Sequence, residues 1–140
     1  MITDKLQRVL NVAARIVSGT RKYDSGLSPI LRADLHWFDV ADRVWYKLGV
    51  TVHRYLQNKA PQYLVDCCVP VSDITSRQRL RSARRCLLTV PRHRRSTVGR
   101  RASSVVGPTV WNLIPDQLTD SYCTESAFRL SLKRFFFNQY

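Results

Sequence analysis

Apolar side chains recur every three or four positions over residues 4–17, the spacing that places them on one face of a helix. The residues that share this face are Leu6, Val9, Leu10, Ala13, Ile16 and Val17. Asp4 can cap the start of the helix, and Gly19 stands where the helix would stop. The pattern therefore predicts an amphipathic helix over 4–17, followed by a polar loop over 20–27.

The longest predicted helix covers residues 39–58 and begins with an aspartate that can cap it. Its apolar stripe consists of Val40, Val44, Leu48, Val52 and either Tyr55 or Leu56. Trp45 widens the stripe, which indicates burial on more than one side. A shorter helix is expected over 30–35, because Ser28 and Pro29 form a cap followed by proline in the first turn.

The next predicted helix is short and covers residues 62–67, since Pro61 restarts helical structure in the same way. A polar stretch over 71–78 follows, and we interpret it as a linker. It separates a helical first half, 1–70, from a second half, 71–140, that holds a basic segment and the C-terminal helices. We expect the two halves to pack as one domain.

The second half mixes a short extended pattern with two helical ones. A candidate strand over 87–90 and a returning one over 97–99 predict a small β-hairpin. A helix is expected over 101–113, although Pro108 would bend or break it. The last helix covers 125–137. Its core side carries Phe128, Leu132, Phe135 and Phe136. The predicted fold class is therefore mainly α, a small helical domain with a short hairpin in the basic middle segment.

The charge of the chain is concentrated in one place. The chain has 140 residues, 44% of them hydrophobic, and a formal net charge of +13. That much apolar sequence is enough for a folded core. No Asp or Glu lies between Asp73 and Asp116, and the basic run over 77–101 cannot neutralise itself. Its arginines are Arg77, Arg79, Arg81, Arg84, Arg85, Arg92, Arg94, Arg95, Arg100 and Arg101.

Arginine suits phosphate better than lysine does, because the guanidinium fork can contact phosphate oxygens in two places and can stack on bases. The basic run therefore predicts binding to RNA, to an RNA–DNA hybrid or to DNA, with no membrane as partner. Phosphate contacts of this kind fix position and carry no sequence information. The alternative is a solvated cationic loop that has no partner.

Catalytic patterns are missing from the sequence. None of the acids forms an adjacent pair after an apolar strand, as a two-metal centre needs, and no Gly-rich phosphate loop precedes a helix. We therefore expect no catalytic residue, no metal and no cofactor in this chain. The cysteines are expected to be buried or half-buried reduced thiols; they are Cys67, Cys68, Cys86 and Cys123.

Neither a membrane span nor a secretory signal is predicted. No apolar run approaches the roughly 20 residues that cross a bilayer, and the first residues lack the charged-then-apolar order of a signal peptide. These observations favour an intracellular protein.

Several phrases of the sequence occur in the same order in one known family. They are LQRVLNVAARIV (6–17), LHWFDV (35–40), RVWYKL (43–48), NKAPQYL (58–64), GRRA (99–102), GPTVWNLIP (107–115) and FRLSLKRFF (128–136). Taken together they resemble the C-terminal part, the thumb and the region after it, of the reverse transcriptases of non-LTR (LINE-type, jockey-like) retrotransposons. The similarity covers nearly the whole chain, and the phrase at 107–115 is the most specific.

The resemblance implies a fragment of an RNA-directed DNA polymerase that is primed at a nicked chromosomal target and acts in the nucleus. The magnesium-binding aspartates of that family would lie upstream, and none of its catalytic motifs is matched here. The fragment would hold template RNA or the RNA–DNA hybrid.

Three alternatives stay open. One is a protein-interaction module whose helices around Trp45 and Trp111 dock on upstream polymerase domains. Another is an independent basic DNA-binding protein. The third is a non-functional, decayed copy of a retrotransposon, because Ser103 stands where the family usually has an aromatic residue.

Overall fold

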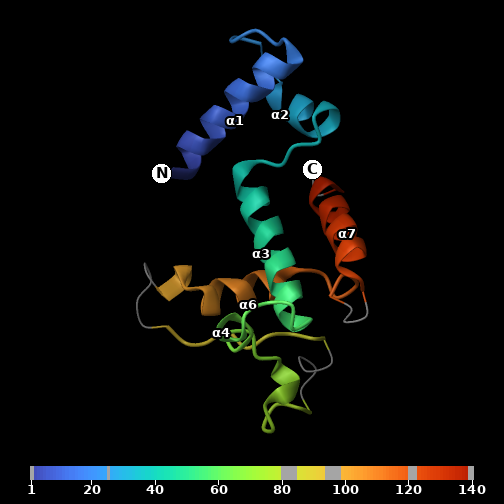
Figure 1. Cartoon of the computed structure of the whole chain (residues 1–140). Coiled ribbons are helices and arrows are strands. Elements are labelled where there is room, and N and C mark those ends of the chain that lie inside the picture. Colours follow the sequence, from blue (N-terminus) through green and yellow to red (C-terminus); the bar gives the residue numbers. More distant parts are fainter. Residues whose placement is uncertain (1, 25, 80–84, 94–98, 120–122, 139–140) are drawn as a thin grey trace. The chain divides into compact units, whose positions relative to one another are not determined.

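Within the described residues the chain is mainly helical, which confirms the predicted fold class. We describe the fold from a computed structural model (Figure 1). It describes residues 2–24, 26–79, 85–93, 99–119 and 123–138.

Each helix predicted from the sequence is present, with some shift of its ends. The elements, labelled as in Figure 1, are α1 (Ile2–Ser18), α2 (Leu27–Pro29), the π-helical turn η1 (Ile30–Asp34), α3 (Val40–Leu56), α4 (Gln62–Val65), the 3-10 turns η2 (Val71–Asp73) and η3 (Gly99–Arg101), α6 (Ser103–Leu113) and α7 (Glu125–Asn138). The predicted helix over 30–35 is formed by α2 and η1 together. Pro108 does not break α6, which continues through it.

The chain divides into two compact units. The first comprises Met1–Trp45 with Phe136–Tyr140, and the second comprises Tyr46–Phe135. The division falls inside α3 and does not coincide with the boundary that we predicted at residue 70. Helices from both predicted halves therefore belong to the second unit.

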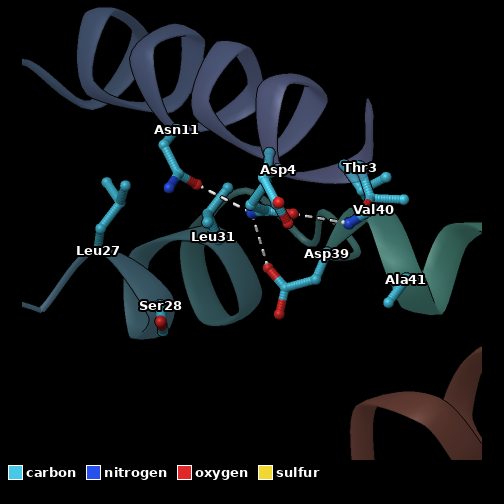
Figure 2. Close-up of a pocket in the computed structure, with 10 residues that line it drawn as sticks. Thr3, Asp4, Asn11, Leu27, Ser28, Leu31, Asp39, Val40 and Ala41 are labelled. Atoms are coloured by element: carbon cyan, nitrogen blue, oxygen red, sulfur yellow. Dashed lines mark hydrogen bonds between the residues drawn. The ribbon is translucent and has the colours of Figure 1, made fainter. Parts of the chain in front are cut away.

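In the first unit, polar side chains attach α1 to the segment that leads into α3 (Figure 2). Gln7 donates a hydrogen bond to Asn11 (2.9 Å) and another to Asp39 (3.1 Å), and it accepts one from the backbone N–H of Val40 (2.8 Å). Ala14 is the residue of α1 that is fully buried. These polar contacts surround a pocket of about 470 Å³ between α1, α2 and the start of α3.

The predicted end of α1 is confirmed. Gly19 adopts a left-handed conformation with φ of 68°, and the N–H of Thr20 bonds to the carbonyl of Arg15 at 3.1 Å. A bond that reaches back five residues past a left-handed glycine is the Schellman pattern of helix ends. The same unit contains a small aromatic cluster, in which Phe38 stacks on Phe137 with ring centres 4.7 Å apart.

The second unit has an apolar core between α3, α6 and α7. Trp111, Phe128 and Leu132 are fully buried, which confirms the predicted core side of α7 at two positions. The helices approach closely at glycines: a Cβ atom on Gly49 would lie 3.1 Å from the Leu132 side chain, and one on Gly107 would lie 3.2 Å from Val52. Glycine therefore sets the helix spacing in this core.

The buried face of α3 includes Val52 of the apolar stripe that we predicted, but its other buried residues lie outside that stripe. The residues of α3 that are buried are Gly49, Val50, Val52 and His53. Val44, which belongs to the predicted stripe, is 48% exposed, and Trp45 is 39% exposed. The prediction of burial around Trp45 on more than one side was therefore wrong. The glycine contact turns the helix toward α6 and α7 along another line of residues.

Within the described residues, the first strand of the predicted hairpin is paired with residues 69–71. The extended segment around Leu88 forms an antiparallel bridge with Pro70. The backbone bonds of this bridge run from Val71 N to Leu87 O (2.9 Å) and from Thr89 N to Val69 O (2.8 Å). Of the predicted returning strand, Gly99 lies in η3, and residues 97 and 98 lie outside the described part of the chain.

Candidate nucleic-acid interface

The middle of the basic run is fixed to α6 by side-chain hydrogen bonds. The indole N–H of Trp111 donates to the carbonyl of Cys86 at 3.0 Å. Asn112 uses both ends of its amide: its Oδ1 accepts from Leu88 N at 2.8 Å and its Nδ2 donates to Leu88 O at 2.9 Å. The Leu88 side chain is buried in the core, at 2% exposure. We refer to residues 86–89 as the anchored segment.

The arginines of the run whose side chains are described lie on either side of the anchored segment. Arg77, Arg79 and Arg85 precede it, and Arg92 and Arg101 follow it. All five of these side chains are exposed. Their exposure agrees with the predicted binding role, because a buried or enclosed guanidinium could not reach a phosphate polymer.

One of these arginines has an acidic partner. Arg85 Nε lies 2.7 Å from Asp116 Oδ2. The hydrogen bond and the charge of Asp116 raise the pKa of Arg85 above its ordinary value. This contact satisfies part of the guanidinium internally, so we expect Arg85 to contribute less to an external partner than the other arginines do.

Part of the predicted site falls outside what the structure describes. This holds for Arg81, Arg84, Arg94 and Arg95, and for the side chain of Arg100. The residues that flank 94–98 do meet: a Cβ atom built on Gly99 would lie 2.8 Å from the Cβ of His93. Gly99 is therefore needed at this point, because any other side chain would collide with His93.

Sequence reasoning missed the residues that hold the segment in place. Trp111 and Asn112 belong to the phrase at 107–115, but we assigned neither a role in positioning the arginines. Trp111 is 2% exposed and belongs to the core of the second unit. No sequence pattern that we know would have paired Asn112 with Leu88.

Helix α3 contains a buried histidine, His53. His53 stacks on Phe128 with ring centres 4.2 Å apart and ring planes 7° from parallel. Burial lowers the pKa of His53 from its ordinary value, since the charged form cannot be hydrated there. Its Nδ1 has no hydrogen-bond partner among the described residues. The contact with Phe128 and the low exposure are those of a neutral core residue.

The cysteines follow the expectation with one exception. Cys68 is buried, and burial raises the pKa of its thiol to about 11. Cys67 and Cys123 are half-buried, but Cys86 is exposed, so the prediction of burial was wrong there. In the part of the chain that the structure describes, no group of three His, Cys, Asp or Glu side chains is placed to hold a metal ion.

Among the described helices, none is long and apolar enough to cross a membrane.

Comparison with known proteins finds no match: no family model, no curated protein and no solved structure matches the chain.

Proposed function

We propose that this chain binds nucleic acid without base specificity, and that it holds template RNA or an RNA–DNA hybrid as the C-terminal part of a LINE-type RNA-directed DNA polymerase. The holding role needs no catalytic residue in the chain. The observation that carries the proposal is a set of exposed arginines without acidic partners on both sides of the anchored segment.

Three arginines outside the run have acidic partners within their own unit. Arg32 lies 2.8 Å from Asp39, and Glu125 accepts hydrogen bonds from both Arg54 (2.8 Å) and Arg129 (2.7 Å). These contacts satisfy the guanidinium groups internally.

Most of the described arginines of the run have no such partner. Arg77, Arg79, Arg92 and Arg101 are exposed, and no acidic group pairs with them among the described residues. Exposed guanidinium groups without an acidic partner, on either side of the anchored segment, support phosphate binding because their donors can contact phosphate oxygens.

The resemblance to LINE-type reverse transcriptases supports the choice of ligand. The phrase at 107–115, which carries the resemblance most specifically, supplies the two residues that hold the anchored segment. A sequence feature of that family therefore has a structural role next to the arginines. This connection supports RNA or RNA–DNA hybrid over an unrelated polyanion.

A charge-matched pair of variants tests the proposal. The probe is a fluorescently labelled RNA–DNA hybrid of about 20 base pairs, and its anisotropy is followed at salt concentrations from about 50 to 200 mM. The binding variant replaces Arg77, Arg79, Arg92 and Arg101 with alanine. The control variant removes the same charge from exposed positions outside the run, by alanine at Arg21, Lys22, Arg43 and Lys47.

The expected result is a loss of salt dependence in the binding variant alone. If each arginine meets one phosphate, the log–log slope falls by about 3, and the wild-type loses roughly 50- to 150-fold more affinity than the variant between about 50 and 200 mM salt. Equal losses in both variants would mean that net charge alone attracts the hybrid. An unchanged affinity would leave the solvated cationic loop as the better description.

The same titration separates the remaining alternatives. An independent DNA-binding protein would prefer one duplex sequence over scrambled duplexes of equal length. A protein-interaction module would not bind the hybrid even at the lowest salt concentration.

A further inference from the structure

The ion pair between Arg85 and Asp116 lies within the candidate interface, and both residues belong to the second unit. Arg85 directly precedes the anchored segment, and Asp116 is the first acid after the basic run. The Oδ2 atom of Asp116 accepts a hydrogen bond from Arg85 Nε at 2.7 Å. The protein therefore places an anionic group of its own against one of the guanidinium groups of the run.

Trp111 holds the backbone on both sides of this pair. Its indole N–H donates to the carbonyl of Cys86, next to Arg85, at 3.0 Å. Its own carbonyl accepts a hydrogen bond from the N–H of Ile114, two residues before Asp116, at 3.1 Å. Because Trp111 is 2% exposed and packed in the core, these two points of the backbone keep their separation. The carboxylate therefore stays within reach of Arg85.

The turn that carries Asp116 is held by its backbone and not by its carboxylate. The N–H of Leu118 donates to the carbonyl of Pro115 at 2.9 Å. The N–H and the hydroxyl of Thr119 both donate to the carbonyl of Asp116, at 3.2 and 3.1 Å. Among the described residues, the partner of the Asp116 carboxylate is Arg85. The carboxylate can therefore be replaced without loss of the turn.

A phosphate can compete with this ion pair. The side chain of Arg85 is 57% exposed and that of Asp116 is 48% exposed. Ion pairs at such positions are weak, because water and salt screen them. The contact uses Nε, one of the five N–H groups of a guanidinium, whereas a phosphate can accept from two of these groups at once. A phosphate can therefore take Arg85, but only by breaking the internal contact.

We propose that Asp116 is an internal competitor of phosphate for Arg85 and that it lowers the affinity of the basic run for nucleic acid. This role rests on the proposed nucleic-acid binding and limits its strength. Arg85 binds a phosphate only in the fraction of molecules in which the ion pair is open, so the affinity is reduced by that fraction. When a strand leaves, the carboxylate pairs with Arg85 again. Such a competitor suits a chain that holds a template strand and must also release it.

The geometry favours competition over a role for Asp116 in orienting Arg85 toward the ligand. A residue that orients another is itself locked in place by packing and by further hydrogen bonds. The Asp116 side chain is nearly half exposed, and its carboxylate has no second partner among the described residues. The two roles predict opposite effects of removing the charge, because a competitor weakens binding and an orienting residue strengthens it.

A double-mutant cycle tests the proposal with the labelled RNA–DNA hybrid. Anisotropy gives the affinity of the wild-type, Asp116→Asn, Arg85→Ala and the double variant at about 150 mM salt. Asp116→Asn should bind about two- to fivefold more tightly than the wild-type, and its log–log salt slope should be steeper by up to about 0.9. The same change should have a smaller effect when Arg85 is alanine, since a lone exposed carboxylate is largely screened at this salt concentration.

The matched control is Asp73→Asn, which removes the same charge from the other end of the acid-free stretch. Asp73 is exposed and accepts a hydrogen bond from Ser72 at 3.2 Å. It pairs with no cation among the described residues. The control should change hybrid affinity by less than about 1.5-fold, because a carboxylate that touches no binding arginine acts only through the screened field. Circular dichroism checks that helix content is equal in all variants.

Three results would overturn the proposal alone. One is an affinity of Asp116→Asn equal to or below that of the wild-type. The others are an equal gain in the Asp73→Asn control and an equal gain when Arg85 is alanine, because both would assign the gain to net charge. Absence of hybrid binding by the wild-type and by Asp116→Asn alike would instead overturn the proposed nucleic-acid binding, and this role with it.

Discussion

The two units of the chain are built in opposite ways. In the first unit, Gln7 makes polar contacts between α1 and the start of α3, and several apolar residues of α1, such as Val9 and Ile16, are exposed. In the second, Trp111, Phe128 and Leu132 form an apolar core, and arginines occupy the surface beside it. The first unit therefore exposes apolar side chains, and the second exposes guanidinium groups.

This difference means that apolar side chains contribute unequally to stability in the two units. An apolar core stabilises through burial, whereas exposed Val or Ile contributes little. Changes in the core of the second unit should therefore affect folding strongly, and changes at the exposed apolar residues of α1 should affect it little.

The largest expected effect is on the core. Phe128→Ala should lower the free energy of unfolding by about 3–5 kcal/mol, because it leaves a cavity between His53 and Trp111. Urea titration followed by circular dichroism measures it. Val9→Ser in α1 is the comparison and should stay within about 0.5 kcal/mol of the wild-type. Similar losses in both variants would contradict the contrast between the units.

A smaller effect is expected at the anchored segment. Asn112→Ala removes both hydrogen bonds to Leu88 and leaves its buried backbone groups unpaired, so the free energy of unfolding should fall by about 1–3 kcal/mol. Affinity for the RNA–DNA hybrid should fall too, although the charge is unchanged. The control is Asn138→Ala at the exposed end of α7. Hybrid affinity equal to that of the wild-type would show that anchoring does not position the arginines.

The smallest effect concerns pH and His53. Because burial lowers its folded-state pKa below the ordinary 6.5, the unfolded chain takes up the proton first as pH falls. The neutral His53 therefore contributes stability above pH 6.5 that is lost progressively below it. The measurement is the urea midpoint between about pH 7.5 and 5.5, a range above the ordinary pKa values of carboxylates. His53→Phe should flatten the curve, and an equally steep curve in that variant would assign it to other groups.

The helices could be predicted because each has a periodic pattern and a local end signal. Gly19 is a good example, since a left-handed glycine closes α1 where the sequence places it. The pattern also identified which residues of α1 share a face. It could not identify what covers that face, because periodicity is the same whether the apolar side meets a core or solvent.

The buried face of α3 was beyond the hydropathy pattern for a related reason. Gly49 has no side chain to score as apolar, yet a Cβ atom there would lie only 3.1 Å from Leu132 and 3.2 Å from Ile114. Helix packing of this kind depends on the absence of a Cβ atom. A sequence pattern that counts hydrophobic side chains instead places Val44 on the buried face, and Val44 is 48% exposed.

The candidate site could also be predicted only in part. The exposure of the arginines followed from their charge and could be predicted. The strand partner could not, because a short extended segment can pair with any free backbone edge, and Val69 and Val71 supply one here.

The fold also changes the interpretation of Ser103, which stands where the family usually has an aromatic residue. The position is exposed at the first turn of α6, where a small polar residue suits a helix start. A serine there leaves no cavity in the core of the second unit. The departure from the family pattern therefore gives no structural reason to regard the chain as a decayed copy.

A backbone hydrogen bond closes the chain beside two of the arginines. The bond from Val71 to Leu87 joins the two ends of the stretch that carries Arg77 and Arg79. Closing a loop removes conformational entropy before any ligand arrives. A phosphate chain that binds Arg77 and Arg79 therefore has less conformational entropy to remove, so inserting residues between Val71 and Leu87 should weaken binding even though every arginine is retained.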